Sequence, residues 1–378
     1  MKITLVAGAR PNFMKIAPII RSLKAAGLHE KDMQYRLVHT GQHYDDSMSG
    51  SFFRQLEIPE PDINLSCKGS SQAEQTASIM IGFERELILN KPDLVLVVGD
   101  VNSTMACTIT AKKLCIDTAH VEAGIRSGDM TMPEEINRMV TDSISDLYFT
   151  TSVMANETLL KQHVSEEKIH FVGNTMIDTL IQQMDKMQIP SCWNNLDSKV
   201  KGYILLTLHR PSNVDDPGRL QLLFDIIQQN AAGYDVIFPI HPRTRKNIEN
   251  YNIETYDIKL IDPQGYLEFI FLLSNSIGVI TDSGGVTEEA TVLNIPCITL
   301  RNTTERPETV IIGTNELVGE EPLYLAMFMS KMLNGQWKKG SIPEKWDGKA
   351  SDRIVEILQQ LYSTSSQMEK EAEIAEMV

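Results

Sequence analysis

The sequence predicts an α/β protein built from two doubly wound units, each with a parallel β-sheet. Short runs of apolar, β-branched residues alternate with helical segments, which is typical of strands covered on both faces by helices. This pattern pauses near residue 173 and restarts at residue 203, and 378 residues are enough for two domains. We therefore expect an amino-terminal domain over 1–172, a carboxy-terminal domain over 173–350, and a helix with a tail over 351–378 that packs back on the first domain.

Composition excludes several classes of function. The formal net charge of -15 argues against a nucleic-acid backbone as partner, although a local basic cluster could still bind an anionic nucleotide. No apolar run is long enough for a membrane span, and Met1 leads straight into a strand without a signal peptide. Five scattered cysteines suggest neither a disulfide framework nor a zinc site, so we expect a cytoplasmic protein without a bound metal.

The elements of the first unit follow from its apolar runs. Lys2 to Ala7 is a buried strand, and the tight turn after it leads into a helix with Pro18 near its first turns. Pro133 suits the first turn of a later helix. The predicted strands are 2–7, 35–40, 93–100, 118–121 and 147–150, and the predicted helices are 13–26, 72–90, 151–163 and one that begins at 132.

The second unit begins after a polar connection over 189–201. Its predicted strands are 203–208, 236–240, 278–281 and 295–300, and its helices are 217–230, 265–274 and 286–293. A helix over 176–189 precedes the connection, and a helix over 352–362 follows the second unit.

Residues 278–308 are the most informative stretch. Ser283, Gly284 and Gly285 lie between a buried strand and a helix, where outward-pointing amides bind phosphate and missing Cβ atoms allow its close approach. Glu289 lies one turn into the helix, where a carboxylate could bind a ribose diol. The alternative is that the glycines only make the turn. The arginines and glutamates of 301–308 crowd the exit of the next strand, which favours a nucleotide-diphosphate clamp.

Charged residues also follow the strands of the first unit. Arg10 and Lys15 flank a helix start, where they could neutralise a diphosphate or could simply be solvated. Asp100, Glu122 and Glu134 lie at successive strand ends or helix starts. Neighbouring carboxylates can supply an acid and a base at neutral pH, whereas a single one could be a helix cap or a solvated charge.

Four further residues have two possible roles each. His209 and Arg210 directly follow a predicted strand, and His241 follows the next one, where each could contact a ligand or only satisfy local hydrogen bonds. Phe269 could stack on a base or pack in the core.

Six motifs together resemble the non-hydrolysing UDP-N-acetylglucosamine 2-epimerases. They are GARPNFMKIAP at 8–18, VGD at 98–100, HVEAGIRSGD at 120–129, MPEEINR at 132–138, TDSGGVTEEA at 281–290 and RNTTERPE at 301–308. The resemblance runs from about residue 1 to about residue 320. It implies two Rossmann-like domains that face each other across a cleft, which is the glycosyltransferase-B architecture.

The resemblance also implies roles for individual residues. Asp100, Glu122 and Glu134 would be the catalytic carboxylates, with His209 beside them. The implied substrate-binding residues are Arg10 and Lys15 at the diphosphate, Ser283, Gly284 and Gly285 at phosphate, Glu289 at the ribose, Phe269 near the uracil and Arg306 at the nucleotide end.

The implied reaction is the reversible epimerisation of UDP-N-acetylglucosamine to UDP-N-acetylmannosamine. UDP would be eliminated to give a 2-acetamidoglucal and then added back, which needs an acid and a base but neither a nicotinamide nor a metal. The resemblance further implies a cytoplasmic homodimer that supplies surface polysaccharide synthesis.

A second UDP-N-acetylglucosamine site activates bacterial members of this family. Gln42, His43, Arg210 and His241 match residues of that site. Asp45 stands where a further Gln is expected, and Lys68-Gly69-Ser70 where an Arg is expected, so allosteric activation is left open.

Other functions are compatible with parts of the pattern. A glycosyltransferase would share the nucleotide clamp but would need an acceptor site. A hydrolysing epimerase would release UDP and free sugar, and a nucleotide-sugar sensor would not need the three carboxylates. Epimerases of other UDP-2-acetamido sugars would share every motif.

Overall fold

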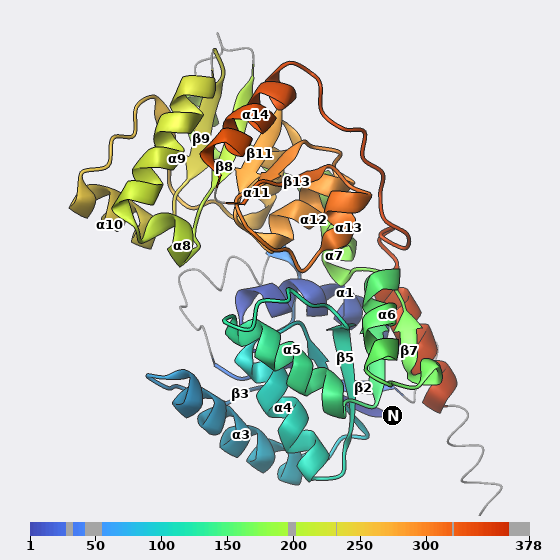
Figure 1. The fold of residues 1–378 in the computed structure, drawn as a ribbon. Coiled ribbons are helices and arrows are strands. Elements are labelled where there is room, and N and C mark those ends of the chain that lie inside the picture. The colour runs from blue at the N-terminus through green and yellow to red at the C-terminus, as the bar shows by residue number, and fades with distance from the viewer. Residues whose placement is uncertain (28–32, 42–54, 196–201, 232, 320, 363–378) are drawn as a thin grey trace, which may run out of the picture. The chain divides into compact units, whose positions relative to one another are not determined.

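The computed structural model describes residues 1–378 except 28–32, 42–54, 196–201, 232, 320 and 363–378 (Figure 1). The chain divides into two compact units, one formed by Met1–Ile181 with Glu344–Val378 and the other by Gln182–Pro343. These limits differ by a few residues from the domain boundaries expected from the sequence. The reason is that helix α7 (Thr175–Gln183) bonds to the first unit, where the Thr179 hydroxyl donates to the Met14 carbonyl.

Seven parallel strands form the sheet of the first unit. They are β1 (Lys2–Ala7), β2 (Gln34–His39), β3 (Ile63–Asn64), β4 (Leu94–Val98), β5 (Asp117–Ala123), β6 (Leu147–Thr150) and β7 (Ile169–Phe171). Their order in the sheet is β3-β2-β1-β4-β5-β6-β7. β4 is buried along its whole length between β1 and β5, which explains its uninterrupted apolar sequence LVLVV.

Helices cover this sheet. The longer ones are α1 (Arg10–Gly27), α3 (Gln72–Leu89), α4 (Asn102–Lys113), α5 (Pro133–Ile144), α6 (Val153–Lys161), α7 and a last helix over 350–362. α4 packs against both α3 and α5, so these three helices form one layer (Figure 1), while α1 packs on β1, β2 and β4. The last helix begins at the Asp178 carboxylate, which accepts hydrogen bonds from the amides of Ala350 and Ser351.

The second unit has a six-stranded parallel sheet. Its strands are β8 (Tyr203–Thr207), β9 (Asp235–Pro239), β10 (Ile258–Ile261), β11 (Gly278–Thr281), β12 (Cys297–Thr299) and β13 (Asn315–Leu317), in the order β10-β9-β8-β11-β12-β13. Its α-helices are α8 (Pro211–Val214), α9 (Pro217–Asn230), α10 (Pro242–Tyr251), α11 (Tyr266–Ser274), α12 (Gly284–Val292), α13 (Pro307–Ile311) and α14 (Pro322–Leu333). The predicted α/β class with two doubly wound units is therefore confirmed.

The strand order fixes where a ligand can bind in each unit. The first sheet runs outward in both directions from the neighbours β1 and β4, and the second from β8 and β11. In open α/β sheets the crevice at such a switch point, outside the carboxyl ends of the strands, is the usual binding site. The segments that leave these four strands carry several of the candidate site residues, among them Lys15, Asp100, His209 and Ser283.

Three elements differ from the sequence prediction near these strand ends. α1 begins at Arg10, so Arg10 belongs to its first turn. β5 continues through Glu122 to Ala123, with an irregular pairing to β6 between Val121 and Ala123. α12 begins at Gly284, so both glycines lie in the helix itself. Within the described ranges, no helix combines the length and apolar character needed to cross a bilayer.

Candidate functional site

A buried ion pair lies at the switch point of the first unit. The ammonium of Lys15, on α1, is 2.5 Å from Oε2 of Glu122, at the end of β5, and the two side chains are only 11% and 4% exposed. Gly99, which follows β4, allows this contact, because a Cβ atom there would lie 3.0 Å from Nζ of Lys15. The sequence-predicted residues Lys15 and Glu122 are thus brought together.

The backbone of Glu122 has an unusual conformation. Its φ is 74°, in the left-handed region that residues other than glycine rarely occupy. This conformation coincides with the irregular pairing of β5 and β6, and bulges of this kind redirect a side chain out of the regular alternation of a strand. The bulge accounts for the way in which Glu122 reaches Lys15 on α1.

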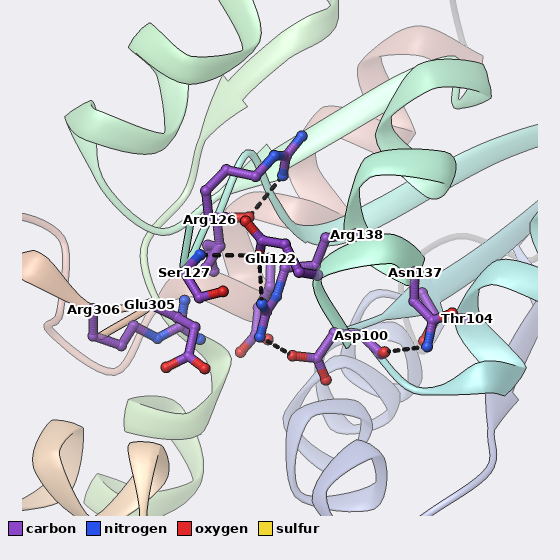
Figure 2. A network of polar contacts seen from close by, with 12 residues as sticks. Asp100, Thr104, Glu122, Arg126, Ser127, Asn137, Arg138, Glu305 and Arg306 are labelled. Atoms are coloured by element: carbon purple, nitrogen blue, oxygen red, sulfur yellow. Dashed lines mark hydrogen bonds and ion pairs between the residues drawn. The ribbon is translucent and has the colours of Figure 1, made fainter. Parts of the chain in front are cut away.

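Arg138 of α5 binds two carboxylates at once (Figure 2). Its Nη2 donates to Oδ2 of Asp100, and its Nη1 lies 2.8 Å from Oε2 of Glu135. Glu135 also accepts hydrogen bonds from the amides of Ser127 and Gly128. Burial opposes ionisation of Glu135, but these two amides and Arg138 outweigh it and lower its pKa.

Asp100 and Glu134 differ in how firmly they are held. Asp100 keeps 27% of its side chain exposed, and its carbonyl accepts a 2.9 Å hydrogen bond from Asn137 of α5 (Figure 2). Glu134 lies in the first turn of α5 and is half-buried. The first unit therefore offers one tightly paired and two more accessible carboxylates.

The second unit presents a helix start at the end of β11. Ser283 caps α12, and Ser283, Gly284 and Gly285 are all half-buried. The Ser283 amide donates to the Thr281 hydroxyl at 3.0 Å. The amides of the first turn of a helix have no partner within the helix and carry a positive partial charge, so this segment can bind a phosphate.

The adjacent glutamates of α12 have different environments. Glu288 forms a buried ion pair with Nε of Arg306. Glu289 is 4% exposed, and burial raises its pKa to about 8, with the Tyr266 hydroxyl opposing that effect and the charge of Glu288 reinforcing it. Burial and the nearby Glu289 carboxylate also raise the pKa of Tyr266 well above its usual value.

A second arginine–glutamate pair lies beside the start of α12. Nη2 of Arg301 donates to Oε1 of Glu305 at 2.7 Å, and Arg210 lies 3.8 Å from the same oxygen. A Cβ atom on Gly284 would be 3.7 Å from Nη1 of Arg301. Oε2 of Glu305 would be 3.9 Å from the same Cβ atom, so both charges of this ion pair adjoin the phosphate-binding segment.

Asp282 organises the loop that follows β8. Its buried carboxylate accepts hydrogen bonds from the amides of His209 and Arg210 and from Nδ2 of Asn213, and it lies 2.8 Å from Nδ1 of His209. Burial raises the pKa of Asp282, but His209 and these donors outweigh it, so the net pKa is lowered. The His209 ring remains 54% exposed and available to a ligand.

The other predicted residues have varied settings. Phe269 on α11 is half-buried, and exposed His241 caps α10 by accepting from the Arg243 amide. The side chain of Arg10 and all of Gln42 and His43 lie outside the described part of the chain. Among the described residues, no three His, Cys, Asp or Glu side chains gather in a way that could hold a metal ion.

Sequence reasoning missed several site residues. Arg138 and Glu135 stand three apart on one helix, a spacing that could have indicated a pair facing the interior. Asp282 was read only as the end of a strand, although a carboxylate directly after a buried strand was the signal used for Asp100.

The doubly wound units and their strand-end charges define a two-domain α/β protein of the glycosyltransferase-B type with anion-binding and acid–base groups. The family UDP-N-acetylglucosamine 2-epimerase matches residues 26–359. A UDP-N-acetylglucosamine 2-epimerase of Methanocaldococcus jannaschii is 42% identical over 95% of this chain and 99% of its own length. A UDP-2,3-diacetamido-2,3-dideoxy-D-glucuronate 2-epimerase of Pseudomonas aeruginosa is 39% identical over 96% of this chain and all of its own length.

A solved structure agrees with these sequence matches. The crystal structure of the M. jannaschii epimerase in complex with UDP-GlcNAc and UDP has a TM-score of 0.85 and 41% identity, and it covers 95% of this chain and 100% of its own. The chain belongs to the non-hydrolysing UDP-N-acetylglucosamine 2-epimerase family, whose members are isomerases. The resemblance based on the sequence motifs is thereby confirmed.

Proposed function

We propose that the protein reversibly epimerises C2 of UDP-N-acetylglucosamine to give UDP-N-acetylmannosamine. The observation that carries the proposal is the carboxylate cluster of the first unit, in which Lys15 pairs with Glu122 and Arg138 binds Asp100. The M. jannaschii relative, which is 42% identical and is named for this activity, supports the same reaction.

The reaction would proceed by elimination and re-addition. A base takes the C2 proton, the C1–O bond breaks, and UDP leaves with the electron pair to give the 2-acetamidoglucal. A proton then reaches C2 from the opposite face, and a β-phosphate oxygen of UDP adds back to C1. This sequence consumes no oxidant and no water, and it needs two proton-transfer groups.

The carboxylates of the first unit would divide these steps. Glu122 or Asp100 would act on the C2 proton, and Glu134 would assist from the other face. The pairing of Glu122 with Lys15 favours its ionised form, which suits a base. The exposed fraction of Asp100 and the half-buried position of Glu134 leave both accessible to a sugar.

The second unit would hold the UDP moiety. The first-turn amides of α12 would bind a phosphate, with Arg301 adding positive charge beside Gly284. Glu289 would bind the ribose hydroxyls, and Phe269 would lie near the uracil. Arg306 would act at the nucleotide end while it holds Glu288. Arg10 and His209 would complete the contacts to the diphosphate and the sugar.

A second candidate substrate has specific support. The P. aeruginosa relative, 39% identical over nearly the whole chain, is named for a 2,3-diacetamido uronate sugar. The proposed proton transfer acts at C2 and would be the same for both sugars. The 2,3-diacetamido substrate is therefore the alternative to test.

The first experiment is proton NMR of the purified protein with UDP-N-acetylglucosamine in D2O. Growing UDP-N-acetylmannosamine signals with deuterium at C2, without accumulation of free UDP, would support the proposal. Equal amounts of UDP and free sugar would indicate a hydrolysing enzyme instead. If no signal changes, the same experiment with the 2,3-diacetamido sugar decides between the two substrates.

Cleavage of the C1–O bond has its own test. UDP-N-acetylglucosamine labelled with ¹⁸O between C1 and phosphorus is incubated with the protein and examined by ³¹P NMR. Migration of the label into non-bridging positions of the β-phosphate is expected if UDP leaves and returns. Epimerisation without migration would rule out elimination.

We also propose a homodimer that supplies surface polysaccharide synthesis. Activation by a second UDP-sugar, for which Gln42, His43, Arg210 and His241 match residues of the family's site, is left open and is decided by progress curves. A lag with UDP-N-acetylmannosamine alone, removed by a trace of UDP-N-acetylglucosamine, would support activation through such a site. Linear progress curves would argue against it. Light scattering during gel filtration measures the oligomeric state.

A further inference from the structure

A histidine and an aspartate form a fully buried pair beside the candidate catalytic carboxylates. His120 lies on β5, and its Nδ1 is 2.7 Å from Oδ1 of Asp142 on α5. Its Nε2 is 2.8 Å from the carbonyl oxygen of Gly99. Both side chains are 0% exposed, so these contacts are closed to water.

The partners determine where the protons are. A backbone carbonyl can only accept, so Nε2 of His120 carries a hydrogen. Oδ2 of Asp142 already accepts from the Gly124 amide at 3.1 Å and lies 2.6 Å from Nη1 of Arg126. Burial opposes ionisation of Asp142, but His120 and Arg126 outweigh it and lower its pKa. Nδ1 of His120 therefore faces the Asp142 carboxylate while Nε2 donates to Gly99, so the two contacts fix the orientation of the ring.

Gly99 connects this pair to the predicted active site. Its amide donates to the Val121 carbonyl at 3.0 Å, and its own carbonyl accepts from His120. A Cβ atom on Gly99 would lie 3.0 Å from Nζ of Lys15 and 3.6 Å from Oε2 of Glu122. The Gly99 backbone is thus the surface on which the Lys15–Glu122 pair rests, and the next residue is Asp100.

The pair joins all three segments that bear the candidate carboxylates. His120 holds the turn before Asp100, Asp142 holds the Gly124 amide two residues after Glu122, and Asp142 lies on the same helix as Glu134. We infer that His120 and Asp142 are positioning residues that fix the three carboxylates relative to one another for proton transfer at C2. This inference rests on the proposed function.

Two substitutions at His120 separate positioning from packing. The amide nitrogen of Gln reaches approximately the place of Nε2, whereas that of Asn reaches the place of Nδ1. His120→Gln therefore keeps the donor to Gly99 and loses the one to Asp142, and His120→Asn does the reverse. Both substitutions disturb the same buried site. If His120 contributed only to stability, the two variants, once folded, should have similar turnover.

We expect His120→Gln to retain a kcat about tenfold or more above that of His120→Asn, because only the first keeps the Gly99–Asp100 turn in place. KM should change little in either variant, because His120 and Asp142 touch none of the residues proposed to contact the nucleotide. The control is His163→Asn, because His163 is exposed and its φ of 63° suits asparagine. We expect this variant to keep the wild-type kcat. Equal kcat values for the two His120 variants would overturn the inference.

A spectroscopic test needs neither a variant nor activity. ¹⁵N-labelled histidine spectra of the wild-type protein should show a hydrogen on Nε2 of His120 that is hydrogen-bonded to the Gly99 carbonyl. A His120 ring without a hydrogen on Nε2 would overturn the inference even if the enzyme is active. A wild-type protein that epimerises neither sugar would instead refute the proposed function, while the ring spectrum still tests the pair.

Discussion

Nζ of Lys15 and Oε2 of Glu122 lie 2.5 Å apart, and both side chains are almost fully buried. Two charges removed from water are stable only if each compensates the other. The pair therefore holds a carboxylate ionised in a place from which water is largely excluded.

Replacing Lys15 with Met should affect both stability and turnover. The change leaves the buried Glu122 carboxylate without the adjacent ammonium, so we expect the free energy of unfolding to fall by about 3 kcal/mol. Turnover should be lost. The double variant Lys15→Met with Glu122→Gln should regain part of the stability but none of the activity, as measured by urea unfolding and by the NMR assay.

The matched control is Lys161→Met. Lys161 pairs with Glu157 at 3.8 Å, and both are well exposed, so its removal should cost less than about 1 kcal/mol. If Lys15→Met and Lys161→Met lower the free energy of unfolding equally, the buried pair stabilises the fold no more than the exposed pair does.

Arg138→Lys tests whether one guanidinium must bind two carboxylates. Arg138 contacts Asp100 and Glu135 through separate nitrogens, and a single ammonium cannot reproduce that fork. We expect kcat to fall about 100-fold, because Asp100 is no longer held, with a much smaller change in UDP affinity. Steady-state kinetics and UDP titration measure the two effects, and a lysine variant with full kcat would contradict the prediction.

The buried Asp282 predicts how stability depends on pH. Its pKa is lower in the folded protein than its usual 3.8, so its contribution is complete above 3.8 and disappears as pH falls through the lowered value. Asp282→Asn should reduce the free energy of unfolding by about 2 kcal/mol near neutral pH. The difference in free energy of unfolding between wild type and Asp282→Asn should disappear at acid pH. Urea unfolding at a series of pH values measures this difference.

Asp262→Asn is the control for that series. Asp262 is 90% exposed and pairs only with the exposed Arg245, so its replacement should leave stability nearly unchanged at every pH. If the difference in free energy of unfolding between wild type and Asp282→Asn is the same at acid and neutral pH, the assignment of the lowered pKa to Asp282 is contradicted.

Glu288 and Glu289 should respond in opposite directions to replacement by Gln. The folded-state pKa of Glu289 is raised to about 8, so wild-type stability falls as pH rises from its usual 4.5 to about 8. The free energy of unfolding of Glu289→Gln should therefore be higher than that of wild type near pH 8 and equal to it below pH 4.5. It should also bind UDP about tenfold more weakly if Glu289 holds the ribose.

Glu288→Gln should instead lower the free energy of unfolding by about 3 kcal/mol, because it removes one partner of the buried pair with Arg306. Urea unfolding at several pH values measures both variants, and UDP titration measures the affinity of Glu289→Gln. If both replacements raise, or both lower, the free energy of unfolding near pH 8, then Glu288 and Glu289 do not have the different environments described above.

Strand ends were the part of the site that could be predicted from sequence. An apolar run followed by a charge or by Ser-Gly-Gly marks both the strand and its carboxyl end, and it placed Asp100 just after β4 and Ser283 just after β11, at the switch points. Parallel strands carry this signal locally, because their buried runs are continuous and the turn after them is short.

The partners of these residues could not be predicted in the same way. Arg138 reaches Asp100 from a position 38 residues away, and Glu122 reaches Lys15 across 107 residues. Such contacts depend on how far a helix is rotated over the sheet, which periodicity fixes only approximately. Glu134 and Glu135 illustrate the difficulty: adjacent residues on a helix face about 100° apart, so only Glu135 turns toward Arg138.

The bulge at Glu122 is a second feature that sequence alone did not reveal. The residues HVEAG read as a strand that stops before Glu122, whereas β5 continues to Ala123 with Glu122 at a φ of 74°. Nothing in the side-chain type predicts that conformation, because glutamate is not enriched at positive φ. The surrounding sheet imposes it.

The first unit is interrupted: the chain leaves it after Ile181 and returns at Glu344. Its last helix then begins at the Asp178 carboxylate, and the indole of Trp346 donates to the Thr151 carbonyl. During synthesis the ribosome therefore releases all of the second unit before the segment from Glu344 that completes the first. The second unit can fold on the nascent chain, whereas the first unit stays incomplete until that later segment has emerged.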